Sequence, residues 1–343
     1  MFSEILINKQ KLLDNIIYIK SCCKGKLCAM VKANAYGHGD EEIVSLLNEY
    51  VDCFGVSNEY EALRIKKIAA KQIIVFGLCQ DYNRLIENEI GFSIVSLNQV
   101  KEIVRSSKSG PKPIFHLCVN TGMNRYGIRS INECKKIISY LQKRGIVLGG
   151  IYTHLSSLTT DKEYSAMQLQ KFEDYRALVP TEWKTIAHIG GGKSIFENYN
   201  VDMNRVGLYL YGYGDKMLSP ILSVQSKIVD TVEVKKGEHI GYLCAYTATK
   251  NMKVATIPLG YGDGLPRKLS NKLEVKINGH QTKVVGNICM DAFMVDVTNV
   301  DCSIGDNVVV FDNASQIASI LDTTEYEVLT NLRKFRGEVK IID

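Results

Sequence analysis

A lysine follows a short apolar run near the start of the chain. Leu27–Val31 has the composition of a buried strand, Lys32 comes directly after it, and a helical pattern opens at Asp40. Lysine is almost never fully buried without a partner, and burial lowers the pKa of an amine until it can attack a carbonyl. A Schiff base with pyridoxal phosphate is the common use of such an amine. A strand-end lysine is also often simply solvated, so a functional role for Lys32 depends on the residues predicted to lie near it.

Other distinctive residues stand where predicted strands end. Arg125 follows the fifth strand, His154 ends the sixth, and Arg205 lies at the end of the eighth. The turn Gly190–Ser194 follows the seventh strand, next to a helix start predicted after the eighth. Such a turn is a phosphate cradle, because exposed backbone N–H groups and the helix dipole favour an anion. Taken singly, these are an ordinary core histidine, a salt-bridge arginine and a loop, but their common placement around Lys32 indicates a binding site.

Eight apolar runs of strand length alternate with amphipathic helical stretches from residue 9 to about residue 212. Eight βα units in roughly 200 residues predict a TIM-type (β/α)8 barrel over residues 8–214, with functional side chains at the carboxyl ends of its strands. A doubly wound open sheet is the alternative, because a count of strands does not prove closure. The predicted strands are 27–31, 53–56, 73–77, 92–95, 114–119, 148–154, 185–189 and 201–206, and the predicted helices include 41–50, 59–70, 97–106, 131–143 and 162–178.

The pattern changes after Gly214. Strand-like runs separated by turns such as Asn278-Gly279 predict a mostly β C-terminal domain over residues 215–343. An N-terminal strand within residues 1–7 is expected to join this domain, so that the chain belongs to the α/β class with a barrel first. The expected strands are 223–235, 253–259, 273–277, 283–285, 294–298, 307–311 and 338–342, with two short helices over 314–321 and 326–332.

The composition is that of an ordinary globular protein, with 45% hydrophobic and 23% charged residues. The formal net charge of +5 is scattered, which argues against nucleic-acid binding. No apolar run reaches the length of a membrane span, and the first residues do not resemble a signal peptide. The ten cysteines include no CxxC pair, which predicts a reducing compartment and no metal site. We therefore expect a cytoplasmic chain, or the cytoplasmic domain of a membrane-anchored protein.

Two further blocks lie in the β-rich part. Leu259–Gly264 contains Tyr261, and Ile288–Asp291 follows it. Alone, Tyr261 would be an ordinary hairpin aromatic. Together with Val31–Gly39 and Asn120–Arg125, these blocks stand in an order that resembles the alanine racemase family over nearly the whole chain. The resemblance implies a pyridoxal-phosphate enzyme that forms a homodimer, in which each active site takes its tyrosine block from the other subunit.

The resemblance implies a role for each motif. Lys32 would carry pyridoxal phosphate, Arg205 would face the ring nitrogen, and His154 would lie against the ring and Arg205. An arginine does not give up its proton, so the ring nitrogen would stay unprotonated and side reactions of a long-lived carbanion would be disfavoured. The phosphate would be held by Tyr36, Gly191, Gly192, Ser194, Gly207 and Leu208. Arg125 would contact the phenolic oxygen of the cofactor or the substrate carboxylate, assisted by the backbone N–H of Met290, and the substrate side would also contain Asp291 and Asn331.

The implied reaction is racemisation of a small amino acid, either alanine or serine. A proton must leave one face of the substrate Cα and another must arrive on the opposite face, which two flanking acid–base groups accomplish directly. Lys32 would serve one face and Tyr261 of the other subunit the second face. In this family the reaction supplies D-amino acids for cell-wall peptidoglycan.

Three positions depart from the family pattern. Cys118 stands where a lysine that braces Arg125 is common, and Asn120 stands where aspartate is usual. The tail over residues 330–336 lacks an Arg-x-Pro-Arg motif and the tyrosine that commonly precedes it. A polar residue such as Asn331 near the pocket would admit a hydroxyl group, as in the serine racemases of vancomycin-resistance systems, so alanine and serine both stay candidates.

Two other functions share part of the pattern. Barrel-type pyridoxal-phosphate decarboxylases also have a lysine after the first strand, and His188–Gly192 resembles their phosphate loop, but the short chain and the Tyr261 block argue against them. Non-catalytic pyridoxal-phosphate carriers resemble the barrel alone, so the β-rich part argues against that function.

Overall fold

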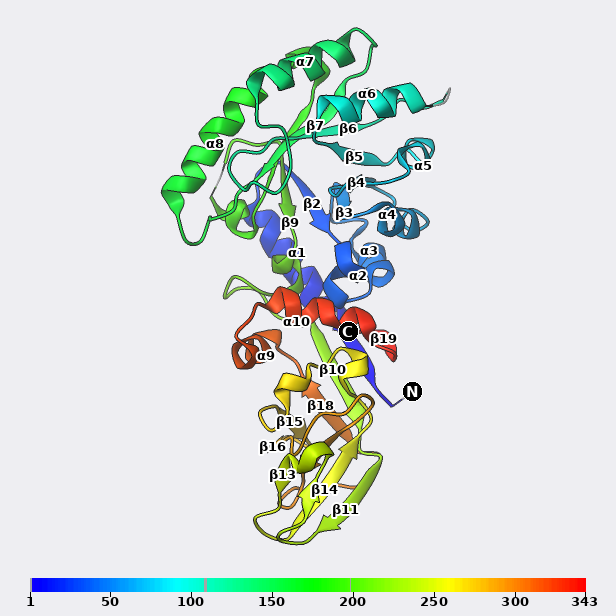
Figure 1. Ribbon diagram of the computed structural model, residues 1–343, viewed down its shortest axis with the longest axis vertical. Coiled ribbons are helices and arrows are strands. Elements are labelled where there is room, and N and C mark those ends of the chain that lie inside the picture. The colour runs from blue at the N-terminus through cyan, green and yellow to red at the C-terminus, as the bar shows by residue number, and fades with distance from the viewer. Residues whose placement is uncertain (1, 108–109, 198) are drawn as a thin grey trace.

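The computed structural model describes residues 2–107, 110–197 and 199–343. The chain forms an elongated molecule with a barrel at one end and β-sheets at the other, and both termini lie near its waist (Figure 1). Met1, which the sequence analysis included in the N-terminal strand, lies outside the described residues.

Eight parallel strands close into a barrel, as the sequence predicted. The first of them pairs with the second on one side and with the last on the other, so that Cys28 lies opposite both Cys53 and Arg205. The open-sheet alternative is therefore wrong. The barrel strands are β2 (Lys26–Met30), β3 (Cys53–Val56), β4 (Gln72–Val75), β5 (Gly91–Ile94), β6 (Phe115–Cys118), β7 (Leu148–His154), β8 (Ile186–Gly190) and β9 (Met203–Val206).

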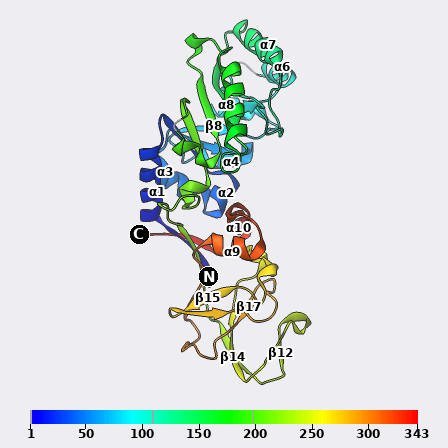
Figure 2. The same cartoon turned by 90° about the vertical axis from the view of Figure 1, so that its left-hand side faces the viewer.

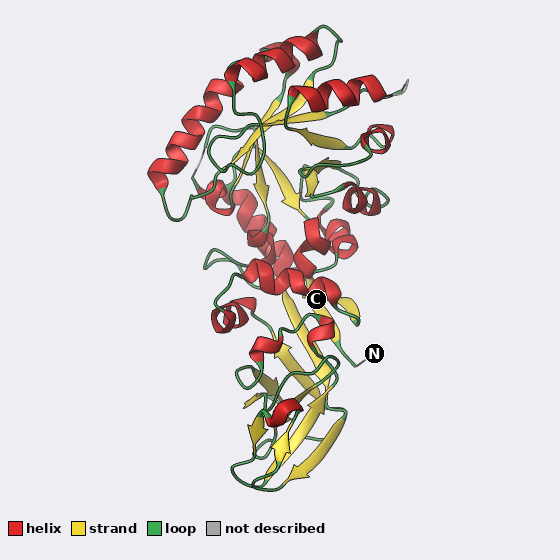
Figure 3. Ribbon diagram, viewed as in Figure 1, coloured by secondary structure: helices red, strands yellow, loops and turns green. Residues whose placement is uncertain are grey.

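Helices surround the barrel strands (Figure 3). Several begin at a capping side chain: Asn58, Ser96 and Ser130 each accept a hydrogen bond from the backbone N–H three residues later, which satisfies a donor that the helix leaves unpaired. No helix within the described residues is long and apolar enough to cross a membrane. The helices of this part are α1 (Lys9–Cys22), α2 (Lys32–Gly37), α3 (Asp40–Leu47), α4 (Glu59–Ile65), α5 (Tyr82–Glu87), α6 (Leu97–Ser106), α7 (Ile131–Gln142) and α8 (Lys162–Arg176).

The helix start predicted after the eighth barrel strand is only a short 3-10 turn. Gly212 adopts a left-handed conformation with φ of 94° and ends the turn after four residues, as glycine often does at the end of a helix. The 3-10 segments of the chain are η1 (Thr181–Trp183), η2 (Gly192–Phe196), η3 (Leu208–Tyr211), η4 (Tyr242–Cys244), η5 (Tyr261–Asp263), η6 (Arg267–Leu269) and η7 (Leu332–Lys334).

The β-rich part contains sheets of six, three and two strands in the described chain. In the six-stranded sheet, β1 (Glu4–Asn8) lies between β10 (Leu222–Lys227) and β19 (Glu338–Ile342), so the two ends of the chain lie side by side. The remaining strands are β11 (Asp230–Val234), β12 (His239–Ile240), β13 (Tyr246–Thr247), β14 (Met252–Ile257), β15 (Glu274–Ile277), β16 (His280–Lys283), β17 (Phe293–Asp296) and β18 (Asn307–Phe311).

Two strand predictions in this part are wrong. The run 223–235 is not one strand, because β10 pairs with β1 and β18 whereas β11 pairs with β14 in another sheet. Periodicity does not reveal such a change of sheet, since both strands alternate along the same chain. The run 283–285 is also no separate strand: β16 ends at Lys283, and Val284 makes only an isolated bridge to Val295.

Two helices connect the β-rich part to the barrel. Both α9 (Ala314–Leu321) and α10 (Glu325–Asn331) lie between the two ends of the molecule (Figures 1 and 2). At α2, a Cβ added to Gly37 would lie 2.1 Å from the carbonyl oxygen of Leu329 in α10. Glycine therefore allows the backbones of α2 and α10 to touch, and this contact brings the C-terminal part of the chain to the mouth of the barrel.

Candidate active site

The carboxyl ends of the barrel strands surround a cavity of about 220 Å3, the place where barrels of this type carry their functional side chains. In the described part of the chain, its lining includes the cationic side chains Lys32, Arg125 and Arg205 and no carboxylate. The cavity therefore suits a ligand that carries negative charge. The other lining residues are Met30, Tyr36, Phe76, Cys118, Val119, Asn120, Met123, Tyr126, Tyr152, Thr153, His154, Gly190, Gly191, Gly192, Gly207 and Tyr326.

Lys32 enters the cavity from the end of β2. Burial lowers the pKa of its amine and the positive charges of Arg125 and Arg205 lower it further, while the negative charge of Glu61 raises it. The amine nitrogen lies 6.0 Å from the ring centroid of Tyr36. An amine with a lowered pKa is neutral at a lower pH than an ordinary lysine, so it can serve as a nucleophile or a base.

The chain directly after Lys32 makes one turn of left-handed helix. Ala33, Asn34, Ala35 and Tyr36 have φ of 54°, 57°, 49° and 55°. A left-handed helical conformation costs a residue that is not glycine roughly 1–2 kcal/mol, so four in succession need support from the surrounding structure. The turn places Lys32 and Tyr36 at the same cavity. Nothing in the residue types predicted it, because alanine and tyrosine have no preference for this conformation.

Arg205 is buried and held from two sides. Its guanidinium donates hydrogen bonds to His188 Nδ1 and to the carbonyl oxygen of Thr153, both at 2.8 Å. Since arginine only donates, the proton of His188 is on Nε2, which lies 2.9 Å from His116 Nδ1. Burial lowers the pKa of His116 to about 3 and that of His188 well below its usual value. Both rings are therefore neutral, and the positive charge stays on Arg205.

Glycines allow the basic groups to gather at the end of β8. A Cβ added to Gly190 would lie 2.5 Å from Arg205 Nη2 and 2.9 Å from His154 Nδ1. Burial, together with the charge of Arg205, lowers the pKa of His154 to about 3, so this ring is neutral as well. Gly191 and Gly192 line the cavity with backbone alone, which matches the predicted anion cradle.

The loop that carries Arg125 is shaped by Asn120, and Cys118 ends the strand before it. Burial raises the pKa of the Cys118 thiol, so this side chain is neutral and offers no negative charge to Arg125. The side-chain oxygen of Asn120 accepts hydrogen bonds from the backbone N–H groups of Gly122 and Asn124, both at 3.1 Å. Its amide nitrogen is buried without a partner. Asn120 therefore shapes this loop through its oxygen alone.

Most of the predicted cofactor residues meet at this cavity, and most of the predicted substrate residues do not. Lys32, Tyr36, Arg125, His154, Gly191, Gly192, Arg205 and Gly207 line it, while Ser194 and Leu208 are buried in the adjoining turns η2 and η3.

The remaining predicted site residues lie in the C-terminal part of the same chain. Tyr261 and Asn331 line a separate, more open cavity. Met290 is 53% exposed, and Asp291 forms an ion pair of 2.8 Å with Arg336. Within one chain, Tyr261 does not line the cavity that holds Lys32.

Tyr326 lines the cavity, although no motif in the sequence predicted it. It lies on α10, and its ring centroid is 5.8 Å from that of Tyr36. Partial burial raises the pKa of the Tyr326 hydroxyl, which therefore stays protonated and can donate a hydrogen bond. Residue pattern could not reveal it, because the contact between α10 and α2 joins segments far apart in the chain.

Comparison with known proteins matches the chain along almost its whole length. The family models "Alanine racemase, N-terminal domain" and "Alanine racemase, C-terminal domain" match residues 7–215 and 221–339. The alanine racemase of Francisella philomiragia is 31% identical, over 95% of this chain and 96% of its own. Among solved structures, the alanine racemase of Clostridium difficile 630 has a TM-score of 0.91 at 29% identity, covering 99% of this chain and 96% of that one. The alanine racemase of Acinetobacter baumannii has a TM-score of 0.86 at 26% identity over the whole of both chains.

Proposed function

The chain belongs to the alanine racemase family, and from this premise we propose that its barrel cavity interconverts L- and D-alanine. The enzyme is an amino-acid racemase; its substrate and the role of each residue are the subject of the proposal. The observation that carries it is a lysine amine of lowered pKa in a cavity of basic groups at the carboxyl ends of the barrel strands. The match over residues 221–339 argues against the decarboxylase and carrier alternatives, for which this part is not expected.

The cavity fits pyridoxal phosphate by the chemistry of its lining. Lys32 supplies the amine that would bind the aldehyde, and the three cations suit an anion. A Cβ added to Gly207 would lie 2.5 Å from the hydroxyl oxygen of Tyr36. Because Gly207 has no side chain, the Tyr36 hydroxyl can lie close to its backbone. Tyr36, Gly207, the Gly191–Ser194 turn and, as a further donor, Tyr326 would hold the phosphate.

The reaction needs groups that move protons at the substrate Cα. Bound pyridoxal phosphate supplies an electron sink for the negative charge that develops there. Lys32 would take or return the proton on one face, since its amine is neutral at a lower pH than a free lysine. Arg205 would donate to the ring nitrogen without releasing its proton, because His188 and Thr153 fix its guanidinium. Arg125 would hold the substrate carboxylate.

The second face requires a second copy of the chain. Tyr261 does not reach the cavity of its own chain, and it is 40% exposed. In the same part of the chain, Leu243 is 84% exposed and Met290 is 53% exposed, and the backbone N–H of Gly262, the residue after Tyr261, donates to the carbonyl oxygen of Met290 at 2.9 Å. Exposed large apolar side chains of this kind suit an association surface. We therefore infer a homodimer in which the partner's Tyr261 completes each cavity.

The pKa of Lys32 gives a prediction that does not depend on turnover. In protein stripped of pyridoxal phosphate, trace acetylation should show Lys32 titrating below the usual value for lysine. Arg125→Gln should move this titration to higher pH, because the charge of Arg125 lowers the pKa of Lys32. Peptide mass spectrometry across a pH series measures the midpoint. Arg129→Gln, which removes an exposed charge outside the cavity, is the control and should leave the midpoint in place.

A side-by-side assay tests the proposed function. Purified protein with pyridoxal phosphate is given L-alanine and L-serine, and D-enantiomers are measured by chiral chromatography. We expect D-alanine to form faster than D-serine. Faster formation of D-serine would assign the serine racemase function that the unusual tail, residues 330–336, made a candidate. Release of carbon dioxide from lysine or ornithine without any racemisation would refute the proposal.

The product would be D-alanine for peptidoglycan, made in the cytoplasm. All ten cysteines are free thiols, and five of them are buried, which agrees with a reducing compartment.

A further inference from the structure

The carboxylate of Glu61 touches the strained turn that carries Lys32 and Tyr36. We propose that Glu61 is a positioning residue of the racemase, which holds this left-handed turn in the conformation that points both side chains into the cavity. The inference rests on the roles proposed above for Lys32 and Tyr36, and it assigns a function to a residue outside the cavity.

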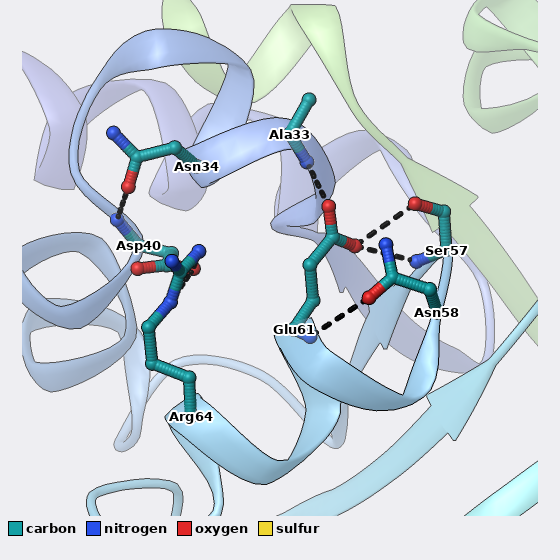
Figure 4. A network of polar contacts seen from close by, with 7 residues as sticks. All are labelled: Ala33, Asn34, Asp40, Ser57, Asn58, Glu61 and Arg64. Atoms are coloured by element: carbon teal, nitrogen blue, oxygen red, sulfur yellow. Dashed lines mark hydrogen bonds and ion pairs between the residues drawn. The ribbon is translucent and has the colours of Figure 1, made fainter. Parts of the chain in front are cut away.

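The contacts of Glu61 join two separate parts of the barrel mouth (Figure 4). Its Oε1 accepts a hydrogen bond of 2.8 Å from the backbone N–H of Ala33, the residue directly after Lys32. Its Oε2 accepts hydrogen bonds from the backbone N–H and the hydroxyl of Ser57, at 2.8 and 2.9 Å. Ser57 directly follows β3, so the carboxylate ties the left-handed turn to the neighbouring barrel strand.

The other side-chain hydrogen bonds of this turn come from within its own segment. The side-chain oxygen of Asn34 accepts from the backbone N–H of Asp40 at 3.1 Å, and His38 Nδ1 bonds to the carbonyl oxygens of Ala35 and Tyr36. All of these groups lie within residues 33–40. Of the side-chain hydrogen bonds to the backbone of the turn in the described structure, the one from Glu61 is supplied by another element.

Glu61 is itself held in place. It lies in the first turn of α4, where its own backbone N–H donates to the capping side chain of Asn58 at 2.9 Å. Because the capped helix restrains the carboxylate, the hydrogen bond to Ala33 restrains the turn. Its negative charge also raises the pKa of Lys32 against the effect of the two arginines. Glu61 therefore affects Lys32 in two ways: it holds the turn that positions the amine, and its charge raises the pKa of that amine.

Glu61→Gln isolates this role with little change in volume. The glutamine oxygen can accept from either Ala33 or Ser57, but its NH2 group then faces an N–H donor at the other site, and a buried donor without an acceptor is unfavourable. Glu59→Gln is the matched control. Glu59 lies on the same helix, and its Oε1 accepts from the backbone N–H of Gln80 at 3.2 Å, away from the turn.

The experiment compares wild-type holoenzyme with both variants by hydrogen–deuterium exchange. In Glu61→Gln, peptides within residues 31–40 should exchange at least about tenfold faster, while peptides from β6 and β7 keep their rates and the melting temperature shows a folded protein. Glu59→Gln should leave residues 31–40 unchanged. Exchange of this segment within twofold of wild type in Glu61→Gln would overturn the inference.

A pH profile supplies a readout that simple loss of structure would not give. Removing the charge of Glu61 lowers the pKa of the free Lys32 amine. The acidic limb of kcat, which reports the enzyme–substrate complex in which this amine is free, should therefore move to lower pH in Glu61→Gln, and kcat should fall more than KM changes. An unmoved limb would overturn the inference. If wild-type protein fails to attach pyridoxal phosphate to Lys32, as read by borohydride reduction and peptide mass spectrometry, the proposed function fails, whereas the exchange result still decides whether Glu61 holds the turn.

Discussion

Lys32→Met is expected to lower kcat for both directions of racemisation by about 10⁴-fold or more, because this change removes both the attachment of pyridoxal phosphate and one of the two proton-transferring groups. Burial and two arginines lower the pKa of the Lys32 amine in the cavity. Methionine keeps a similar length and packs well, so the fold should survive.

Initial rates with L- and D-alanine measure this loss, and visible absorbance after addition of pyridoxal phosphate should show no stable adduct. Lys26→Met is the matched control, since Lys26 begins the same strand, β2, at the opposite end of the barrel. We expect it to retain normal kcat. A Lys32→Met enzyme with activity within tenfold of wild type would show that another group performs the chemistry.

Tyr261→Phe is expected to produce an asymmetric loss. Removal of the Cα proton from one enantiomer should slow by about 10²–10⁴-fold, whereas removal from the other enantiomer, which Lys32 would perform, should change far less. Single-turnover exchange of the Cα hydrogen into D2O, measured separately with L- and D-alanine, separates the two steps. Tyr242→Phe, an exposed tyrosine of the same part of the chain, should leave both rates unchanged. Equal losses for the two enantiomers would contradict the two-base assignment.

Mixing the two inactive variants tests whether the cavity is shared between subunits. A heterodimer of Lys32→Met and Tyr261→Phe chains has one site with both groups and one with neither. After unfolding and refolding together, random pairing should restore about a quarter of wild-type activity. No recovery, with heterodimers shown by mass spectrometry, would mean that both groups act within one chain.

The barrel was predictable because its strands are short, largely buried apolar runs, and the segments between them are amphipathic or polar. Runs such as Leu148–His154 and helices such as Leu97–Ser106 have the bounds that their hydrophobic pattern predicts. The β-rich part was less predictable. Strands of two residues, such as His239–Ile240, are too short for a periodic pattern, and the change of sheet after Lys227 leaves the alternation of side chains undisturbed.

Residue types and their positions were enough to predict the fold and the candidate site residues that it carries. A lysine after the first barrel strand, a glycine turn after the seventh and an arginine at the end of the eighth can be recognised from residue type and position, because parallel strands of a barrel end on one face. How these groups are held could not be predicted in this way. The left-handed turn of Ala33–Tyr36 depends on Glu61 from α4, and Tyr326 reaches the cavity through the contact of α10 with α2. Both depend on long-range contacts that stabilise an arrangement local sequence does not prefer.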